Sequence, residues 1–384
     1  MKYNLAYGSQ FIDKKDINIV SNSLKEKLIT TGKYVKSFEE NLKNKLNSKF
    51  SFTCINGTAG LHLAFMAINL KKYDVVIMPS INFISSYRVA NLIGAKIYLT
   101  DVDPVSGQMT PMLVQECIKK NKLKKIKAIV TMYLGGYPEN IIDFYKIKKQ
   151  YSCFLIEDAC HAFGSKYEYR KQIHYIGSCK HSDLCVFSFH PVKTITTGEG
   201  GAITTNNKFL AKRIKLLKNH GIVKEKQYWK YDIRELGFNY RLSDINCALG
   251  LSQLNKLEKF ITKRKNIFLT YKNKLKNLKS FLNFPCYSNN FNSYHLFIIK
   301  VNFKKLKTNK DKMFRHLIQK GIYPQFHYVP INKFSFYKNK NNEEFKGAEE
   351  YYNNSFSLPI YYDLKKNELL YIIKIINNFI TKNR

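Results

Sequence analysis

The sequence has few acidic residues and no long apolar run. Only 28 Asp and Glu residues accompany 64 Lys and Arg in 384 residues, which leaves a formal net charge of +36. No window approaches the roughly 18 uninterrupted apolar residues of a membrane-spanning helix, and Met1-Lys2-Tyr3-Asn4 opens no secretory signal. These absences argue against a membrane-spanning or secreted protein, so we expect a cytoplasmic one.

Paired cysteine spacings are also missing. The eight cysteines include no Cys-x-x-Cys pair, a basic stretch separates Cys179 from Cys185, and Cys153 begins an apolar run. Closely spaced thiols mark most structural zinc sites and redox motifs. We therefore expect reduced thiols and no bound metal.

The excess of positive charge is spread along the whole chain. Lysines recur in short clusters, such as residues 119–125 and 304–307, beside Asn, Ile and Tyr. A nucleic-acid site more often shows a concentrated basic patch with interleaved aromatic residues. The pattern indicates solvated faces and argues against nucleic-acid binding, although the charge would help to attract an anionic substrate.

Short apolar runs alternate with helical patterns. The apolar runs at residues 52–55, 75–78, 96–99, 126–131, 153–156 and 184–187 predict strands. Helical stretches separate most of them, which is typical of a largely parallel sheet covered by helices. From about Leu242 the chain turns helical and basic, and from about Leu282 its elements are shorter and mixed. We expect a large domain over residues 1–250 and a small C-terminal α/β domain over residues 251–384.

One lysine lies in a loop suited to a phosphate-bearing ligand. The predicted strand at residues 184–187 leads to Ser188 and then to Lys193, and glycines at residues 198–201 permit tight turns close to a ligand. An amine in a partly apolar pocket is less readily charged, so it can attack a carbonyl and form a Schiff base. Pyridoxal phosphate is the carbonyl compound that this loop suggests, but one lysine among so many basic residues proves little.

A carboxylate at a second strand end strengthens this interpretation. The run at residues 153–156 delivers Glu157 and Asp158 to its carboxyl end, where ligands bind in open α/β sheets. A carboxylate there can pair with the protonated pyridine nitrogen of the cofactor and keep the ring an electron sink. Asp158 alone would equally suit a turn. The lysine loop follows at the end of the next predicted strand, which favours a shared site.

The turn Asn56-Gly57-Thr58-Ala59 predicts the phosphate end of the same site. It links a strand to a helix that opens near Thr58, and free N–H groups at a helix N-terminus favour a dianion. Thr58 also suits an ordinary helix cap, which is compatible with this role. The hydroxyl of Ser188 is expected to donate a further hydrogen bond to the phosphate.

Five segments in this order resemble the DegT/DnrJ/EryC1/StrS sugar aminotransferase family across nearly the whole chain. They are Leu28-Ile29-Thr30-Thr31-Gly32 with Phe38-Glu39, residues 56–62, residues 157–162, residues 188–201 and Gly237-Phe238-Asn239-Tyr240-Arg241-Leu242-Ser243. Within the family, residues 187–193, 219–224, 239–244 and 327–337 are most similar to the branch that serves pseudaminic acid biosynthesis.

The resemblance implies the fold and the cofactor contacts. The large domain should be a fold-type I pyridoxal phosphate unit, similar to aspartate aminotransferase, with a mostly parallel seven-stranded sheet. Phe83 should stack on the pyridine ring, and His161 should hydrogen-bond the phenolic oxygen of the cofactor. Family members work as homodimers with shared active sites, so Asn239 is expected to reach the phosphate of the neighbouring subunit.

A second set of residues is expected to recognise the substrate. His327 and Tyr328 match a small-domain segment that borders the sugar pocket in relatives. His220 and Arg241 would suit the carboxylate of the amino donor or the pyrophosphate of the nucleotide, and each suits a packing or helix-terminal role equally well.

The resemblance implies a two-stage transamination. Lys193 would hold the cofactor and move protons, L-glutamate would give the amino group, and C4 of a UDP-linked 4-keto-6-deoxy-N-acetylhexosamine would receive it. Rival hypotheses are another branch of the family, of the GDP-perosamine or UDP-bacillosamine type, and a basic DNA-binding protein without enzymatic activity. Dehydratase relatives carry histidine in place of the lysine, so Lys193 argues against that class.

Overall fold

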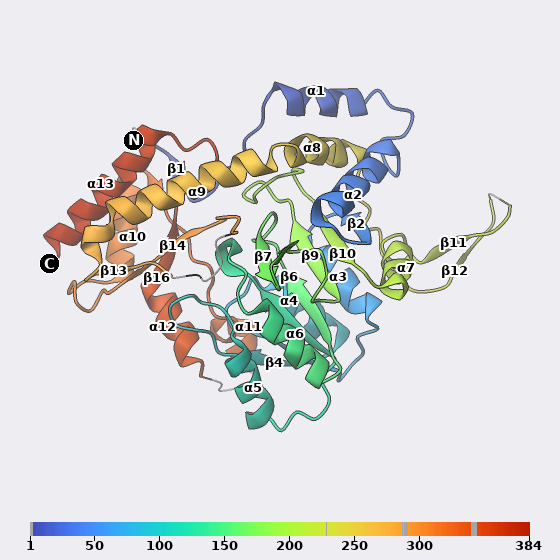
Figure 1. Ribbon diagram of the computed structural model, residues 1–384, viewed down its shortest axis with the longest axis horizontal. Coiled ribbons are helices and arrows are strands. Elements are labelled where there is room, and N and C mark those ends of the chain that lie inside the picture. Colours follow the sequence, from blue (N-terminus) through green and yellow to red (C-terminus); the bar gives the residue numbers. More distant parts are fainter. Residues whose placement is uncertain (1–2, 228, 286, 288–290, 339–343) are drawn as a thin grey trace.

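The structure is a computed structural model that describes residues 3–227, 229–285, 287, 291–338 and 344–384. A twisted sheet lies between two layers of helices, and a smaller group of elements packs beside it (Figure 1). In spatial order the seven strands are β2 (Phe50–Cys54), β10 (Gly201–Thr205), β9 (Leu184–Ser188), β6 (Phe154–Asp158), β5 (Ala128–Met132), β3 (Val75–Pro79) and β4 (Lys96–Thr100). Only β10 runs antiparallel to its neighbours. The prediction of a mostly parallel seven-stranded α/β sheet is confirmed.

Helices cover both faces of this sheet because its strands are apolar on both sides. Val76 and Met78 of β3 belong to one core, whereas Ile77 between them belongs to the other, as the alternation of side chains along a strand requires. The first core lies under α3 (Gly57–Ala67), α4 (Ser85–Ile93) and α7 (Lys208–Leu217). The opposite face is covered by α2 (Lys33–Leu46), α5 (Pro111–Lys120), α6 (Ile141–Gln150) and α8 (Asp244–Leu254). The short η1 (Leu134–Gly136) follows β5, and α1 (Lys14–Ser23) packs on α8.

Most of the remaining elements form a second core around a small antiparallel sheet. That sheet contains β13 (Leu282–Asn283), β14 (Phe297–Val301) and β16 (Ser355–Leu358). Around it lie α9 (Leu257–Lys274), η2 (Lys276–Leu278), α10 (Lys310–Gln319), α12 (Lys346–Asn354) and α13 (Lys366–Lys382). The short η3 (Ile331–Lys333) and α11 (Ser335–Lys338) instead place Ile331 and Tyr337 in the first core of the large sheet. Strand β1 (Leu5–Ala6) pairs in parallel with β15 (Ile322–Tyr323), so the start of the chain joins the second core. The predicted division between residues 250 and 251 falls inside α8 and stays a prediction.

Two hairpins lie outside the central sheet. The hairpin of β7 (Lys166–Tyr169) and β8 (Gln172–Tyr175) interrupts the chain between β6 and β9. The expectation that the lysine loop follows the very next strand was therefore wrong along the chain, although β9 is the neighbour of β6 in the sheet. The hairpin of β11 (Ile222–Lys224) and β12 (Tyr231–Ile233) projects from the body of the molecule (Figure 1).

In the described part of the chain, seven cysteines are free thiols, six of them buried. Cys286 lies outside the described residues. No helix in this part of the chain is long and apolar enough to cross a membrane.

A buried carboxylate joins the N-terminus of α2 to α8. Asp244, at the start of α8, accepts hydrogen bonds from the backbone N–H groups of Gly32 (2.7 Å), Tyr34 (2.8 Å) and Val35 (3.3 Å). These donors lie at the N-terminus of α2 and have no partners within that helix. A Cβ atom at Gly32 would lie 2.8 Å from Asp244 Oδ1, so only glycine fits this close approach. The carboxylate thereby satisfies the first turn of α2 and fixes its position on α8.

Replacing this carboxylate should destabilise the fold. We expect Asp244→Ala to lower the free energy of unfolding by about 3 kcal/mol, because it leaves buried N–H groups without acceptors. Asp143→Ala removes a carboxylate from an exposed ion pair with Lys146 and should cost less than about 1 kcal/mol. Urea denaturation of both variants gives the comparison. Equal losses would contradict a capping role for Asp244.

Candidate active site

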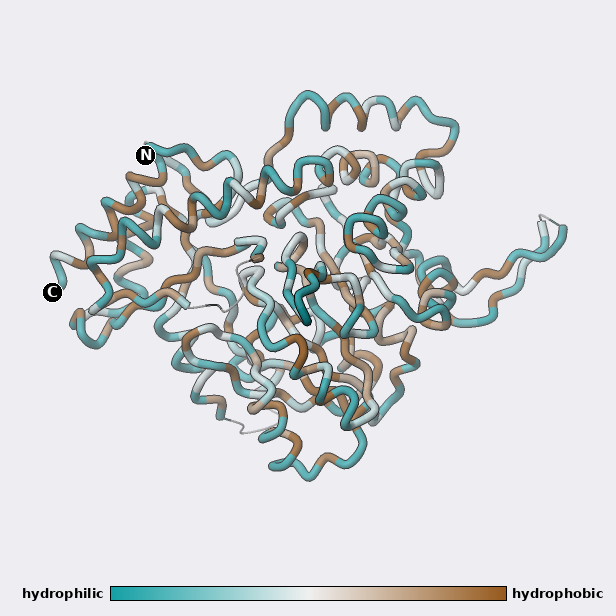
Figure 2. The backbone as a smooth tube through the Cα atoms, in the orientation of Figure 1, coloured by the Kyte–Doolittle hydropathy of each residue, from teal (hydrophilic) through white to brown (hydrophobic). Residues whose placement is uncertain are grey.

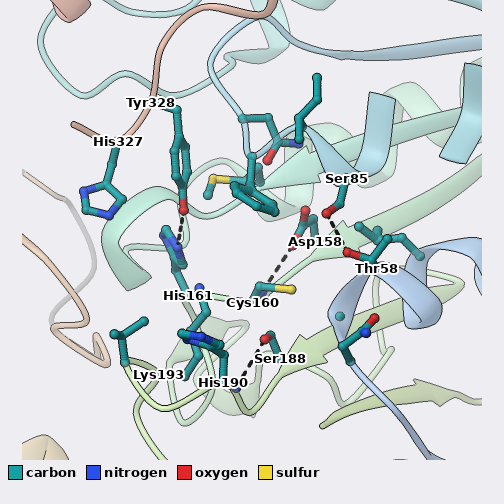
Figure 3. A pocket seen from close by; sticks show the side chains of 18 of the residues that line it. Thr58, Ser85, Asp158, Cys160, His161, Ser188, His190, Lys193, His327 and Tyr328 are labelled. Carbon is teal, nitrogen blue, oxygen red and sulfur yellow. Dashed lines mark hydrogen bonds between the residues drawn. The ribbon is translucent and has the colours of Figure 1, made fainter. Parts of the chain in front are cut away.

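A cavity of about 550 Å³ lies at the carboxyl ends of β6 and β9, which are neighbours in the sheet, and of β2, which β10 separates from β9. Asp158 ends β6, Ser188 ends β9, and Asn56 follows β2. Strands β9 and β10 are antiparallel, with Ser188 opposite Gly201, so the loop between them begins and ends at this edge. Lys193 lies in that loop. Figure 3 shows Asp158, Ser188 and Lys193 around one pocket, as the sequence predicted for residues far apart along the chain.

The start of α3 forms a cradle at one end of the cavity. Asn56 caps the helix by accepting a hydrogen bond from the N–H of Ala59 at 2.8 Å. Gly57 and Thr58 line the cavity, and the Thr58 hydroxyl lies 2.7 Å from that of Ser85. A Cβ atom at Gly57 would lie 3.1 Å from Ser188 Cβ and would crowd the cradle. Backbone N–H groups at a helix N-terminus, together with hydroxyl groups, favour a bound anion. Ala59 contributes to the cap and does not line the cavity.

Asp158 and Lys193 form the charged centre of the site. Burial raises the pKa of Asp158, while hydrogen bonds from Cys160 and the charge of Lys193 oppose that rise. The N–H of Cys160 donates to Asp158 Oδ1 at 3.3 Å. Burial lowers the pKa of Lys193, opposed by electrostatic interactions with Cys160 and Asp158. The predicted chemistry needs two such groups. One is a carboxylate whose charged form a cationic partner stabilises, and the other is an amine that loses its proton more readily than usual.

Aromatic and imidazole side chains form the opposite wall. Phe83 lies at the rim with 53% of its surface exposed, and its ring centroid is 5.7 Å from that of Tyr328. His161 and Tyr328 are in contact, with 2.8 Å between Nε2 and Oη. His327 also lines the cavity, and its Nδ1 lies 2.9 Å from the hydroxyl of Ser357. The two residues predicted from the small domain therefore do reach the cavity.

The three other predicted residues lie away from the cavity of their own chain. Asn239 forms an isolated bridge with Asn219, and Arg241 donates to the side chain of the same Asn219. The N–H of His220 donates to the carbonyl of Phe238 at 3.0 Å. All three lie near the base of the β11–β12 hairpin. Within one subunit, the structure does not bring them to the residues that surround Lys193.

Sequence reasoning missed several residues that line the cavity. Tyr7 comes from the N-terminal segment, Cys160 and His190 from the two strand-end loops, and Phe334 from the loop after η3. Cys160, His190 and Phe334 were inside recognised segments and thus offered a signal. Tyr7 offered none, because nothing in an isolated tyrosine indicates that its segment folds back over a distant loop.

Comparison with known proteins identifies the kind of enzyme that has this arrangement. Residues 10–377 match the model of the DegT/DnrJ/EryC1/StrS aminotransferase family. The UDP-4-amino-4,6-dideoxy-N-acetyl-beta-L-altrosamine transaminase of Campylobacter jejuni (serotype O:23/36, strain 81-176) is 36% identical over 369 residues, which cover 96% of this chain and 95% of that one. The GDP-perosamine synthase of Escherichia coli O157:H7 is 30% identical over 380 residues, with 99% of each chain covered.

Solved structures show the same fold. Helicobacter pylori PseC, an aminotransferase involved in the biosynthesis of pseudaminic acid, superposes with a TM-score of 0.90 at 28% identity, covering 99% of this chain and all of the other. Spr1654 of Streptococcus pneumoniae in its PLP form superposes with a TM-score of 0.89 at 25% identity, over the whole of both chains.

Proposed function

This chain belongs to the DegT/DnrJ/EryC1/StrS aminotransferase family, and we propose that it is a C4 aminotransferase of nucleotide sugars in the pseudaminic acid pathway. Its donor is L-glutamate and its acceptor a UDP-4-keto-6-deoxy-N-acetylhexosamine, which becomes UDP-4-amino-4,6-dideoxy-N-acetyl-beta-L-altrosamine. One observation carries the proposal: an amine, a buried carboxylate and an anion cradle converge on one cavity at the carboxyl edge of the sheet.

The residues around the cavity fit pyridoxal 5'-phosphate. Because residue 57 is glycine, no side chain crowds the cradle, and a phosphate can approach Gly57, Thr58 and Ser188. Ala59, predicted as a further contact, lies behind them and contributes only to the helix cap. Asp158 is buried beside Lys193 and suits a protonated ring nitrogen. When bound, the cofactor supplies a carbonyl that carries the amino group and a ring that spreads negative charge.

Each side chain then has one task. Lys193 would hold the cofactor and, as a free amine, would move a proton to and from the reacting carbon, which its lowered pKa favours. Asp158 would keep the ring nitrogen protonated. Phe83 would pack against the ring, and His161 would lie near its oxygen. The wall of His327 and Tyr328 would face the sugar.

The sugar nucleotide is the point on which related enzymes differ. The proposal of a UDP sugar rests on the greater similarity to the Campylobacter transaminase than to the GDP-perosamine synthase. Assays with separate UDP- and GDP-linked 4-keto sugars, followed by identification of the aminated product, test it directly. Preferential amination of the GDP sugar would move the enzyme to the other branch of the family.

The β11–β12 hairpin supports a homodimer with shared active sites. It projects from its own subunit, yet Figure 2 shows hydrophobic stretches along it, and Ile233, Leu236 and Phe238 expose 53%, 88% and 44% of their surfaces. Exposed apolar surface of this kind marks interaction sites. Asn239 follows directly, so a partner that covers the hairpin would receive Asn239 near its phosphate cradle. His220 and Arg241 would accompany it and meet the donor carboxylate or the pyrophosphate.

The covalent bond to Lys193 can be tested by labelling. Borohydride reduction of the protein loaded with pyridoxal phosphate, followed by peptide mapping, should place the label on Lys193. Lys310 provides a demanding comparison, because burial lowers its pKa to about 8, yet it lies outside the cavity lining. Lys193→Ala should abolish turnover, whereas Lys310→Ala should retain it. A label on Lys310 or any other lysine would overturn the assignment.

The two adjacent carboxylates of β6 allow a matched test of Asp158. Asp158→Asn should retain the cofactor but lose roughly 100-fold or more in rate, because the ring nitrogen loses its ionic partner. Glu157 points to the opposite face of the sheet, where it accepts from Tyr133 Oη at 2.7 Å and from Ser182 Oγ at 3.0 Å. Glu157→Gln should keep the wild-type rate. Steady-state kinetics with saturating cofactor distinguishes the two carboxylates, and similar rates for both variants would refute the proposed ion pair.

Mixed dimers test the contribution of Asn239. Alone, Asn239→Ala should weaken cofactor binding by about 1–3 kcal/mol, as for other hydrogen bonds to charged groups. Mixing it with Lys193→Ala creates one site with both defects and one intact site if Asn239 acts across the interface. Activity should then rise after subunit exchange, which mass spectrometry of differently tagged chains verifies. Unchanged activity after verified exchange would mean that Asn239 does not act in the partner's site.

A further inference from the structure

Both ring nitrogens of His161 are already bonded to protein groups. The backbone N–H of Gly135 donates to Nδ1 at 3.3 Å, and Nε2 lies 2.8 Å from the hydroxyl of Tyr328. A neutral imidazole has one donor and one acceptor nitrogen. Because Nδ1 accepts, the proton resides on Nε2, and His161 donates to Tyr328. Burial and the charge of Lys193 hold the pKa of His161 well below its usual range, so this neutral form persists.

The direction of this hydrogen bond determines where the proton of Tyr328 goes. Tyr328 Oη acts as the acceptor, so its own O–H must point to another group. Within the described part of the chain, Oη makes only the bond to His161. Burial raises the pKa of Tyr328 well above its usual value, and the nearby carboxylate of Asp158 adds to that shift, so the phenol keeps its proton. Tyr328 lines the cavity (Figure 3). A ligand bound there can therefore accept this proton.

The surroundings hold His161 in one orientation. Gly135 adopts a φ of 73°, and a Cβ atom there would lie 2.8 Å from the ring of Tyr137, so its N–H is presented by a turn that excludes other residues. The ring of His295 packs against that of His161 at 4.4 Å between centroids. Ser293 donates its hydroxyl to the carbonyl of His161 at 2.8 Å. The ring is thus held by Gly135 and His295 and its backbone by Ser293, which suits His161 to orient a neighbour.

We propose that Tyr328 donates a hydrogen bond to a carbonyl or phenolate oxygen of the ligands in this cavity, and that His161 is a positioning residue that acts through Tyr328. The acceptor is either the ring oxygen of the cofactor or the keto oxygen of the sugar. A neutral, oriented phenol suits both, because each carries negative charge on oxygen during the reaction. The inference rests on the proposed function and replaces a direct contact between His161 and the cofactor with a relay.

The first test reads the proton on His161 without any turnover. In the cofactor-free protein labelled with ¹⁵N-histidine, the signal that disappears in His161→Gln should show a protonated Nε2 and an unprotonated Nδ1. That pattern should persist through the pH range in which surface histidines titrate. A proton on Nδ1, or a charged ring near neutral pH, would overturn the relay. This result does not depend on whether the protein transaminates.

The second test compares variants that keep or remove each hydrogen bond. Tyr328→Phe should slow turnover by roughly 10–100-fold, the kinetic equivalent of one strong hydrogen bond. His161→Leu should fall to a similar rate, and the double variant should be no slower than either, because both changes remove one unit. His161→Gln retains an N–H donor toward Tyr328 and should recover most of the rate. Additive losses, or equal rates for the glutamine and leucine variants, would contradict the relay.

A remote pair provides the control, and the half-reactions identify the ligand oxygen. Tyr167 Oη lies 2.7 Å from His181 Nδ1, outside the cavity lining, so Tyr167→Phe loses a similar phenol–histidine bond and should keep full activity.

If Tyr328→Phe changes the spectrum of bound cofactor and slows both half-reactions, the acceptor is the cofactor oxygen. If it slows only the half-reaction with the keto sugar, the acceptor is the sugar. If neither changes, the inference is wrong.

The wild-type protein separates failure of the relay from failure of the proposed function. Glutamate should change the absorption of the cofactor-loaded wild type, and the keto sugar should reverse that change. A wild type without this response would refute the transaminase proposal, whatever the NMR result. A responsive wild type combined with a Tyr328→Phe variant of unchanged rates and spectrum would refute only the relay.

Discussion

The parallel pairing of β6 with β9 is the contact on which the rest of the site depends. Asp158 pairs with Val186, two residues before the end of β9, so the carboxylate and the lysine loop leave the sheet side by side. Side chains alternate along a strand, and a slip of one residue would turn Asp158 away from the cavity and Glu157 toward it. The hydrogen bonds of Glu157 to Tyr133 and Ser182 on the opposite face resist that slip. A buried polar contact behind the sheet thus helps to fix the register that the chemistry in front of it needs.

The sequence allowed prediction of those parts of the fold whose signals are local. Each of the apolar runs taken as strands, including residues 75–78 and 184–187, contains or overlaps a strand of the central sheet, because strands buried on both faces are continuously apolar. The cradle at Gly57 and the loop of Lys193 were also visible, since turns that approach a ligand require particular residues at particular positions. The resemblance to the family then predicted features that no single residue indicates, such as the number of strands in the central sheet.

Features that depend on distant or exposed partners could not be predicted. The strands of the β7–β8 hairpin are mostly polar and only partly buried, so they show no apolar run, and the hairpin was overlooked between Asp158 and Lys193. The contact of Tyr328 with His161 joins residues that lie 167 positions apart, and only the folded chain reveals which atom of each ring meets the other. The partner of Asp244 was equally hidden. Its position is typical of an acidic residue in the first turn of a helix, here α8, yet its carboxylate binds the start of α2.

The pairing of β1 with β15 has a consequence for the order in which the protein matures. Leu5 is synthesised long before its partner Ile322. The central sheet, whose strands all precede residue 206, can assemble in the meantime, since domains generally fold as they emerge. The wall that carries Tyr328 follows β15 directly and therefore closes last. A nascent chain would hold a nearly complete cofactor cradle well before it has a finished substrate wall.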